Sequence, residues 1–198
     1  MPTLRYSPAS PYARKIRLAA AVVGLEDRIA ITPADTADPN DSLRKQNPLG
    51  KIPTLLLDDG QSLYDSRVIA EYLDAMAGGG RLFPADPARR FAALRLQALG
   101  DGICDAALLI RIETFSRPEA LRWPEAVALQ QGKIDRALEA LEAAPPAGDI
   151  DIGHLAVACA LGYLDLRFDG AWRNVCPKLA AWLTSLEAKV PAFGATKA

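Results

Sequence analysis

The chain has 198 residues, half of them hydrophobic and 24% charged, a composition typical of ordinary folded proteins and not of disordered or fibrous ones. Its 23 basic and 24 acidic residues leave a net charge of −1, which gives no electrostatic reason to expect nucleic acid as a partner. Because no apolar run is long enough to cross a bilayer and no signal peptide is evident, we expect a cytoplasmic protein without membrane association.

The three cysteines, Cys104, Cys159 and Cys176, lie far apart and form no CxxC pair. Their spacing therefore indicates neither a disulfide framework nor a zinc site. Free cysteines are usually buried, so we expect three inert thiols and no bound metal.

The first third of the chain alternates strand and helix signals. Leu4 and Tyr6 fall on one face of a short strand over residues 3–6. Ser10 as N-cap and Pro11 at the first helical position then form a well-defined helix start. A second alternating strand covers residues 28–32, so the strand–helix–strand order predicts a parallel pair with a right-handed crossover.

Residues 47–66, NPLGKIPTLLLDDGQSLYDS, hold a second group of signals. Asp59-Gly60 between two apolar runs is a strong hairpin signal, so residues 54–57 and 63–64 are predicted to pair as antiparallel strands. A helix follows from Ser66 to Met76.

Two features of this stretch favour one kind of ligand. Pro53 lacks an N–H and interrupts strand pairing, which leaves the backbone amide and carbonyl of Ile52 free to meet an extended partner. Ser66 lies at a helix N-terminus, where unpaired N–H groups and the helix dipole favour a carboxylate. An extended peptide with a carboxylate at one end would satisfy both features.

The segments NPLGKIPTL and YDSRVIAEYL resemble the cis-proline segment and the acidic-residue-then-serine motif of the glutathione S-transferase superfamily. The resemblance spans nearly the whole chain and is specific in the first third. It implies a cis bond before Pro53, and glutathione as the ligand. It further implies that Ile52 pairs with the cysteinyl unit, that Asp65 and Ser66 hold the γ-glutamyl end, and that Lys51 lies near the glycyl carboxylate.

A glycine run followed by Pro84 and Pro87 marks the best candidate domain boundary. We therefore predict an α/β thioredoxin-like domain over residues 1–77, a linker over 78–87 and an all-helical domain over 88–198, the architecture that the resemblance also implies. Apolar periodicity predicts helices over residues 87–114, 124–144, 152–168 and 177–189, and the third of these is apolar on nearly every side.

Ser10-Pro11-Tyr12-Ala13 resembles the Cys-Pro-Phe/Tyr-Ala motif of the cysteine-type members, with serine in place of cysteine. A serine oxygen cannot form a mixed disulfide, so the substitution argues for a hydroxyl that stabilises the thiolate of glutathione. Ser10 is the first candidate for this role. Ser7, three residues earlier, and Tyr6, where the tyrosine-type members carry their catalytic phenol, remain alternatives.

A free thiol with a pKa near 8.5 is only about 3% ionised at pH 7. Lowering that pKa by about two units raises the thiolate fraction but weakens the nucleophile, for a net gain of only about threefold. Most of the rate must then come from holding the electrophile against the sulfur. For that second-substrate pocket the candidates are Ala9, Leu108, Arg111 and Ile112.

Three other polar residues have simpler interpretations. In dimeric members of the superfamily, an acidic residue on the helix that carries Asp101 and Asp105 can reach the partner's γ-glutamyl amine. A solvated helix face is the preferred explanation of both. His154 stands where the superfamily usually has an aspartate at the start of the central helix. We expect Asp151 to cap this helix and His154 not to reach back.

The leading hypothesis is a cytoplasmic, homodimeric glutathione transferase in which Ser10 stabilises a thiolate that attacks a small apolar electrophile. One alternative is a non-catalytic module of the same fold that binds protein partners or apolar ligands. Another is a glutathione-dependent isomerase or dehalogenase.

Overall fold

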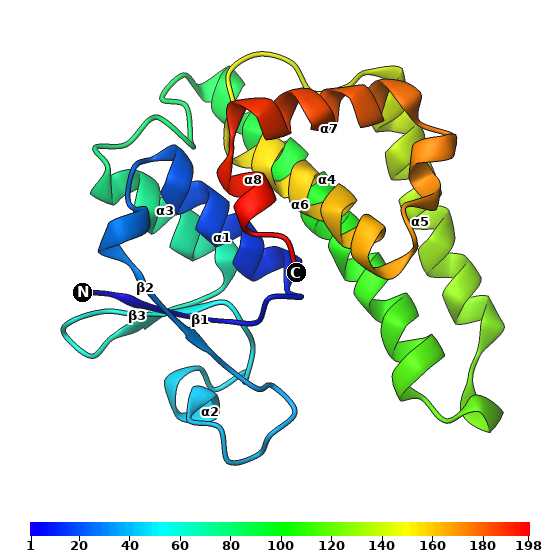
Figure 1. Cartoon of the computed structure of the whole chain (residues 1–198), viewed down its shortest axis with the longest axis horizontal. Coiled ribbons are helices and arrows are strands. Elements are labelled where there is room, and N and C mark those ends of the chain that lie inside the picture. The colour runs from blue at the N-terminus through cyan, green and yellow to red at the C-terminus, as the bar shows by residue number, and fades with distance from the viewer.

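The computed structural model describes residues 1–198, which form a four-stranded mixed sheet with helices, followed by an all-helical part (Figure 1). The strands are β1 (Thr3–Tyr6), β2 (Ala30–Pro33), β3 (Thr54–Leu56) and β4 (Ser62–Leu63). Their order is β2-β1-β3-β4; β1 and β2 are parallel, and the other two pairs are antiparallel. The predicted parallel pair and the predicted hairpin are therefore confirmed. The second strand begins at Ala30, because residues 26–28 form a 3-10 turn.

The helices follow the predicted periodicity closely. They are α1 (Pro11–Val22), α2 (Leu43–Gln46), α3 (Ser66–Met76), α4 (Pro87–Arg111), α5 (Pro124–Ala143), α6 (Ile152–Arg167), α7 (Pro177–Lys189) and α8 (Ala192–Ala195). Sequence periodicity missed α8, which has a single turn. The Arg14 guanidinium stacks on the Phe193 ring, 4.0 Å from its centroid, and donates to the Phe193 carbonyl. The C-terminal segment is thereby attached to α1.

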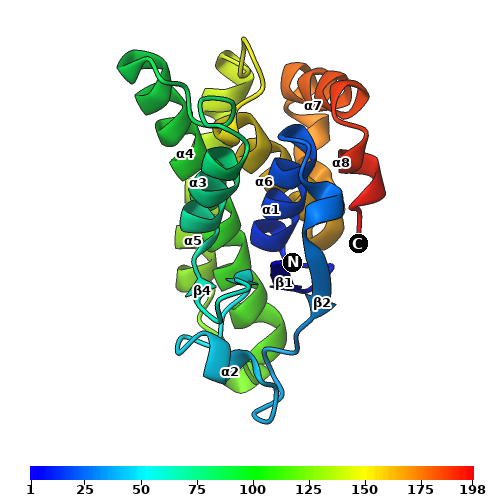
Figure 2. The same ribbon diagram turned by 90° about the vertical axis from the view of Figure 1, so that its left-hand side faces the viewer.

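Helix α1 lies between the two parts of the molecule, and it contacts α3, α6 and α8 (Figures 1 and 2). The hydrophobic core is one continuous cluster that includes Leu4 of β1, Ile16 of α1 and Leu155 of α6. Lys15 of α1 adds a buried ion pair, with its Nζ 2.6 and 2.8 Å from the two carboxylate oxygens of Asp101 on α4. The side chains of this pair are 1% and 4% exposed, so water does not screen the contact. We refer to residues 1–77 as the sheet domain and to 88–198 as the helical domain.

One carboxylate fixes the backbone of the segment between the domains. Asp74, buried near the end of α3, accepts hydrogen bonds from the backbone N–H groups of Gly80, Arg81 and Leu82 at 2.7–3.0 Å. Leu82 and the following Phe83 are themselves buried. The glycine run therefore makes a turn whose far side is anchored in the core.

Helix α6 begins with a hydrogen-bonded cap. The Asp151 carboxylate accepts from the N–H groups of Gly153 and His154 at 2.9 and 3.1 Å, as the sequence predicted. The expectation that His154 does not reach back is wrong. Its Nδ1 lies 3.4 Å from the Asp151 N–H and 2.8 Å from the Asp151 carboxylate, because the imidazole is long enough to fold over the first turn.

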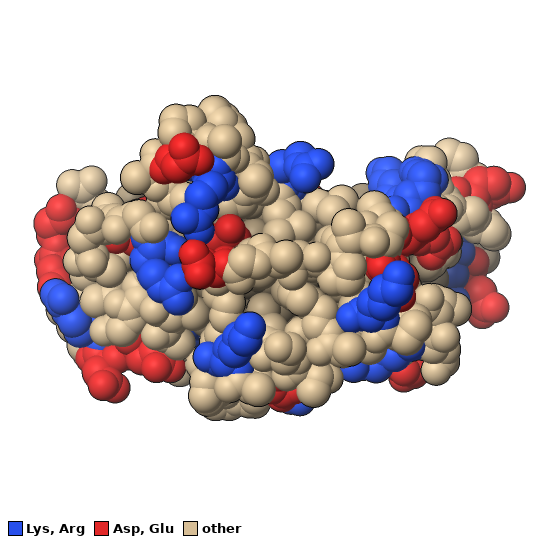
Figure 3. Space-filling model, turned by 90° about the horizontal axis from the view of Figure 1, so that it is seen from above, with Lys and Arg blue, Asp and Glu red and all other residues tan.

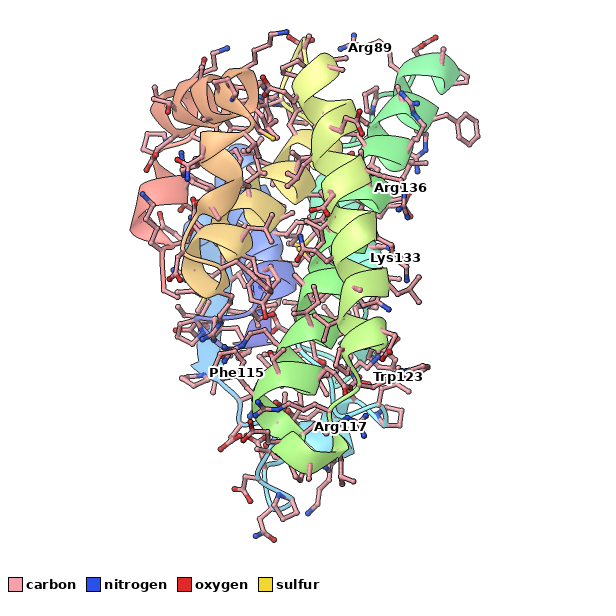
Figure 4. All side chains as sticks on the ribbon, turned by 90° about the vertical axis from the view of Figure 1, so that its right-hand side faces the viewer. Arg89, Phe115, Arg117, Trp123, Lys133 and Arg136 are labelled. Atoms are coloured by element: carbon pink, nitrogen blue, oxygen red, sulfur yellow. The ribbon has the colours of Figure 1, made fainter.

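The turn between α4 and α5 is held by Glu113. Its carboxylate accepts from Arg117 at 2.8 Å and from the backbone N–H of Trp123 at 2.6 Å, and both residues lie at the far end of the helical domain (Figure 4). The Trp123 hydrogen bond is the main cause that holds the pKa of Glu113 below its usual range.

The face seen from above carries basic and acidic side chains in small mixed groups, separated by uncharged surface (Figure 3). None of the helices combines the length and the apolar character that a membrane-spanning segment needs.

Two glycines let α4 and α6 approach closely. A Cβ on Gly100 of α4 would lie 2.6–2.8 Å from the backbone of Ala156 and Val157, and one on Gly153 of α6 would lie 2.7 Å from the Ala93 carbonyl. Real Cβ atoms do not come so close, so the two helices could not keep this spacing with larger residues.

We therefore expect Gly100→Ala to lower the free energy of unfolding by about 1–3 kcal/mol, because the methyl group overpacks the α4–α6 contact. Gly102→Ala is the matched control: it lies in the same helix, and its Cβ would meet nothing within 4 Å. That control should be stabilising by about 0.5–1 kcal/mol. Urea denaturation followed by circular dichroism measures both. Equal effects of the two substitutions would contradict the close packing of the helices.

Candidate functional site

A cavity of about 810 Å³ lies between the sheet domain and the helical domain. This volume is within the range of small-molecule sites. Its walls come from the loop after β1, the start of α1, the loop before β3, the start of α3, and one face each of α4 and α6. The residues predicted for the site that line it are Ala9, Ser10, Lys51, Ile52, Pro53, Asp65, Ser66 and Leu108.

Ser10 caps α1 at the cavity wall. Its Oγ accepts the N–H of Ala13 at 3.2 Å, and its backbone is extended, as an N-cap requires. The hydroxyl hydrogen is donated to no group in the chain, and the N–H of Tyr12 in the first turn has no partner. The α1 start therefore presents an unused O–H and an unused N–H beside the positive end of the helix dipole.

The loop before β3 presents the backbone of Ile52. The Ile52–Pro53 peptide bond is cis, as the resemblance implied. Neither the N–H nor the carbonyl of Ile52 takes part in a hydrogen bond within the chain. The neighbouring Lys51 is exposed, and its ammonium group forms no ion pair. Ile52 can thus pair with an extended ligand, and Lys51 can meet an anion.

Asn47 holds this loop in place, a role that the sequence analysis did not assign. Its side chain is 1% exposed and donates to the Lys51 carbonyl at 3.0 Å and to the Thr54 hydroxyl at 3.1 Å. It also accepts from the Leu49 N–H at 2.9 Å. One buried amide therefore fixes the backbone on both sides of Gly50.

The start of α3 forms another part of the wall. The Asp65 carboxylate caps the helix by accepting the Arg67 N–H at 2.9 Å, while the N–H of Ser66 has no partner in the chain. Arg67 reaches across to α4, with its Nε 3.2 Å from Asp101. A helix N-terminus with an open N–H and an adjacent hydroxyl suits a carboxylate, and Asp65 beside it suits an ammonium group.

The expectation that Asp101 lies on a solvated helix face is wrong. The Asp101 carboxylate is buried and held by Lys15 and Arg67. Asp105, one turn later, is exposed and accepts a hydrogen bond from the Tyr12 hydroxyl. Burial, reinforced by this bond to Asp105, raises the pKa of Tyr12 far above its ordinary value, so the phenol stays protonated.

The remaining candidates lie elsewhere. Arg111 and Ile112 are not among the lining residues, and the Arg111 guanidinium stacks on the Phe115 ring at 3.5 Å. Of the alternatives to Ser10, Ser7 lines the cavity, whereas Tyr6 packs against the core. Sequence reasoning missed Tyr163 and Arg167, which line the cavity from α6. Their four-residue spacing at the end of an otherwise apolar helix was the only available signal.

The three cysteines are buried and unpaired, as predicted. Burial raises the pKa of Cys159 to about 12 and that of Cys104 well above its ordinary value, so neither thiol is a nucleophile near neutral pH. No cluster of His, Cys, Asp or Glu side chains could hold a metal ion.

Fold and cavity together define a protein with a thioredoxin-like domain, a helical domain and a peptide-sized site between them. The family model for the glutathione S-transferase N-terminal domain matches residues 9–76, and that for the C-terminal domain matches residues 124–185. The chain is also 32% identical over 166 residues to the uncharacterized GST-like protein YibF of Escherichia coli, with 81% of each chain covered. The chain belongs to the glutathione S-transferase family.

Solved structures agree. A glutathione transferase family member from Pseudomonas fluorescens Pf-5, with bound glutathione, has a TM-score of 0.92 and 44% identity over 100% of this chain and 98% of that one. The member from the same source with bound S-(propanoic acid)-glutathione has a TM-score of 0.89 and 42% identity, covering 100% and 99%. A glutathione S-transferase from Methylobacillus flagellatus KT with glutathione bound has a TM-score of 0.91 and 36% identity, covering 100% and 99%.

We expect Asn47→Ala to lower the free energy of unfolding by about 1–3 kcal/mol, because it removes a buried amide that bonds the Leu49 N–H, the Lys51 carbonyl and the Thr54 hydroxyl. Asn40→Ala is the control: Asn40 is exposed and its side chain makes no hydrogen bond, so the change should stay within about 0.5 kcal/mol. Thermal or urea unfolding compares the two. If both variants were equally stable, Asn47 would not be holding the loop.

Proposed function

We propose that this protein is a glutathione transferase in which Ser10 stabilises the thiolate of bound glutathione. The observation that carries the proposal is the convergence on one cavity of three unsatisfied groups. These are the Ser10 hydroxyl, the Ile52 backbone, and the open N–H of Ser66. Glutathione is an extended peptide with a thiol in the middle and charged groups at both ends, so it offers a partner to each.

In this proposal, the cysteinyl unit lies extended along the loop before β3 and pairs with the N–H and carbonyl of Ile52. The γ-glutamyl carboxylate accepts hydrogen bonds from the Ser66 N–H and hydroxyl, and the γ-glutamyl ammonium group contacts Asp65. The glycyl carboxylate lies near Lys51. The family model that covers residues 9–76 and the glutathione-bound relatives support this placement.

Ser10 would then face the sulfur. Its oxygen already accepts the Ala13 N–H and its hydrogen remains free, so it can donate to a sulfur anion without giving up its capping bond. A hydrogen bond to an anion is worth about 1.5–3 kcal/mol, and the helix dipole about 0.3–1 kcal/mol. Together they would lower the thiol pKa by about one to two units.

The second substrate is a small, largely apolar electrophile. Ala9 and Leu108 line the cavity and supply an apolar wall. The S-(propanoic acid)-glutathione bound to the Pseudomonas relative supports an electrophile of a few carbon atoms.

A cytoplasmic homodimer is part of the same proposal. Val68 of α3 and Phe91 of α4 are exposed apolar side chains, at 47% and 69%, on two helices joined by the ion pair between Glu71 and Arg90. A second copy of the chain would cover them, and the exposed Asp105 of α4 is the candidate acidic residue for the partner's γ-glutamyl amine. Sizing in solution tests the dimer.

Ser10→Ala should cut the conjugation rate at least about tenfold while leaving the affinity for glutathione nearly unchanged, because the hydroxyl serves the anion and not the bound peptide. Conjugation assays and calorimetric titration with glutathione measure the two quantities.

The double variant Asp65→Ala with Ser66→Ala is the matched control and should do the reverse, weakening glutathione affinity through loss of the γ-glutamyl contacts. Unchanged turnover in Ser10→Ala would transfer the role to Ser7. Absence of glutathione binding by the unmodified protein would favour a non-catalytic interaction module instead.

A further inference from the structure

The helical wall of the cavity carries a cation that no acidic group of the chain neutralises. Arg167, the last residue of α6, lines the cavity and forms no ion pair with a carboxylate of the chain. Its Nε is buried and has no partner. A buried donor without an acceptor costs free energy, so such a group in a cavity wall is a reason to look for a ligand.

The acidic groups of the cavity are already engaged. Asp101 is held by Lys15 and Arg67, Asp105 accepts the Tyr12 hydroxyl, and Asp65 caps α3. None of them contacts Arg167. The Arg167 guanidinium therefore has no carboxylate partner, whereas Arg67 at the α3 end is paired with Asp101.

Tyr163 lies one helical turn before Arg167, so both side chains lie on the same face of α6. Tyr163 lines the cavity together with Ala9, Ser10 and Pro11 and is 6% exposed. Burial raises the pKa of Tyr163, while the nearby charges of Arg167 and Arg111 act in the opposite direction. The phenol is thus a protonated donor that stands between the Ser10 wall and the guanidinium.

A helix C-terminus favours a cation, so dipole complementarity alone could account for an arginine at this position. An arginine serving only that purpose would keep its guanidinium in water or on the last carbonyls. The exposed Arg173 pairs with Asp165 in that ordinary surface manner, with its Nη2 2.6 Å from the carboxylate. In Arg167, by contrast, the Nε is buried and the side chain lines the cavity.

We propose that the electrophile accepted by this cavity carries a carboxylate, which the Arg167 guanidinium binds with the Tyr163 hydroxyl as a second donor. This inference rests on the proposed function and narrows its substrate class: the carbon skeleton meets Ala9 and Leu108, and the acid group meets α6. The planar guanidinium matches a carboxylate with two parallel hydrogen bonds, which a neutral substrate cannot accept with equal strength.

The simplest reaction of this class is addition to an α,β-unsaturated acid. The thiolate sulfur forms a bond to the β-carbon, and the electron pair of the carbon–carbon double bond moves to the α-carbon, which takes a proton from water. The proton of the thiol has already passed to solvent, nothing is oxidised or reduced, and no group leaves. The product is an S-(carboxyalkyl)glutathione.

The test compares S-(carboxyalkyl)glutathiones of increasing methylene number with their neutral amides, by calorimetric titration of the unmodified protein. At the length that spans from the sulfur to Arg167, the acid should bind at least about tenfold more tightly than its amide. Arg167→Gln should abolish this preference and leave the affinity for glutathione itself unchanged.

Arg136→Gln is the control arginine. Arg136 is exposed on α5, the helix at the outer edge of the helical domain, and it should keep the full preference (Figure 4). Equal affinity of acid and amide at every length, or a preference that survives Arg167→Gln, would overturn the inference while leaving glutathione binding intact. If the unmodified protein bound neither glutathione nor any conjugate, the inference and the proposed function would both be wrong.

Discussion

The buried ion pair between Lys15 and Asp101 joins α1 of the sheet domain to α4 of the helical domain at the base of the cavity. Because Asp101 also binds Arg67, one carboxylate fixes the positions of α1, α4 and the start of α3. Such a pair gives little net stability compared with a hydrophobic contact of the same size, but removing one partner leaves an uncompensated buried charge. Its contribution is therefore geometric: it sets how the two domains face each other.

The contacts around this pair determine what the cavity presents. Close packing at Gly100 and Gly153 holds α6 against α4, which places Tyr163 and Arg167 on the wall opposite the loop before β3. Asn47 fixes that loop and leaves the Ile52 backbone unpaired. The result is a site with peptide-binding groups on the sheet domain and an apolar wall with one free cation on the helical domain.

A site with glutathione-binding groups on one domain and an electrophile-binding wall on the other agrees with the energetics of thiol chemistry. A hydroxyl and a helix dipole can raise the thiolate fraction. A thiolate of lower pKa is also a weaker nucleophile, so most of the gain in rate is lost. The larger contribution comes from holding the electrophile in line with the sulfur, where effective molarities are high. The helical wall, and not Ser10, would then decide which electrophiles react, and an arginine there would favour those that carry an acid.

The sheet domain was largely predictable from the sequence, because its signals are local. The Ser10-Pro11 helix start, the Asp59-Gly60 hairpin and the helix start at Ser66 each depend on a few neighbouring residues. Asp101 was misread because its partner Lys15 is 86 residues away in the sequence and no local pattern pairs them. Periodicity on α4 likewise could not tell that the cavity ends near Leu108, so Arg111 and Ile112 were included.

The helix α8 and the role of Arg167 were missed for related reasons. A single turn such as α8 has no periodicity to detect, and it forms because Phe193 docks on Arg14. Arg167 ends an apolar helix, where a charged residue ordinarily marks the return to solvent. Only the packing of α6 against α4 turns that residue toward the cavity.

The most direct test of the account is the pKa of the glutathione thiol when bound, followed by the ultraviolet absorbance of the thiolate as pH is varied. With the sulfur at the start of α1 and facing Ser10, the bound thiol should titrate about one to two units below the free value near 8.5. A bound thiol that titrates at the free value would contradict the placement of the sulfur and the role of Ser10.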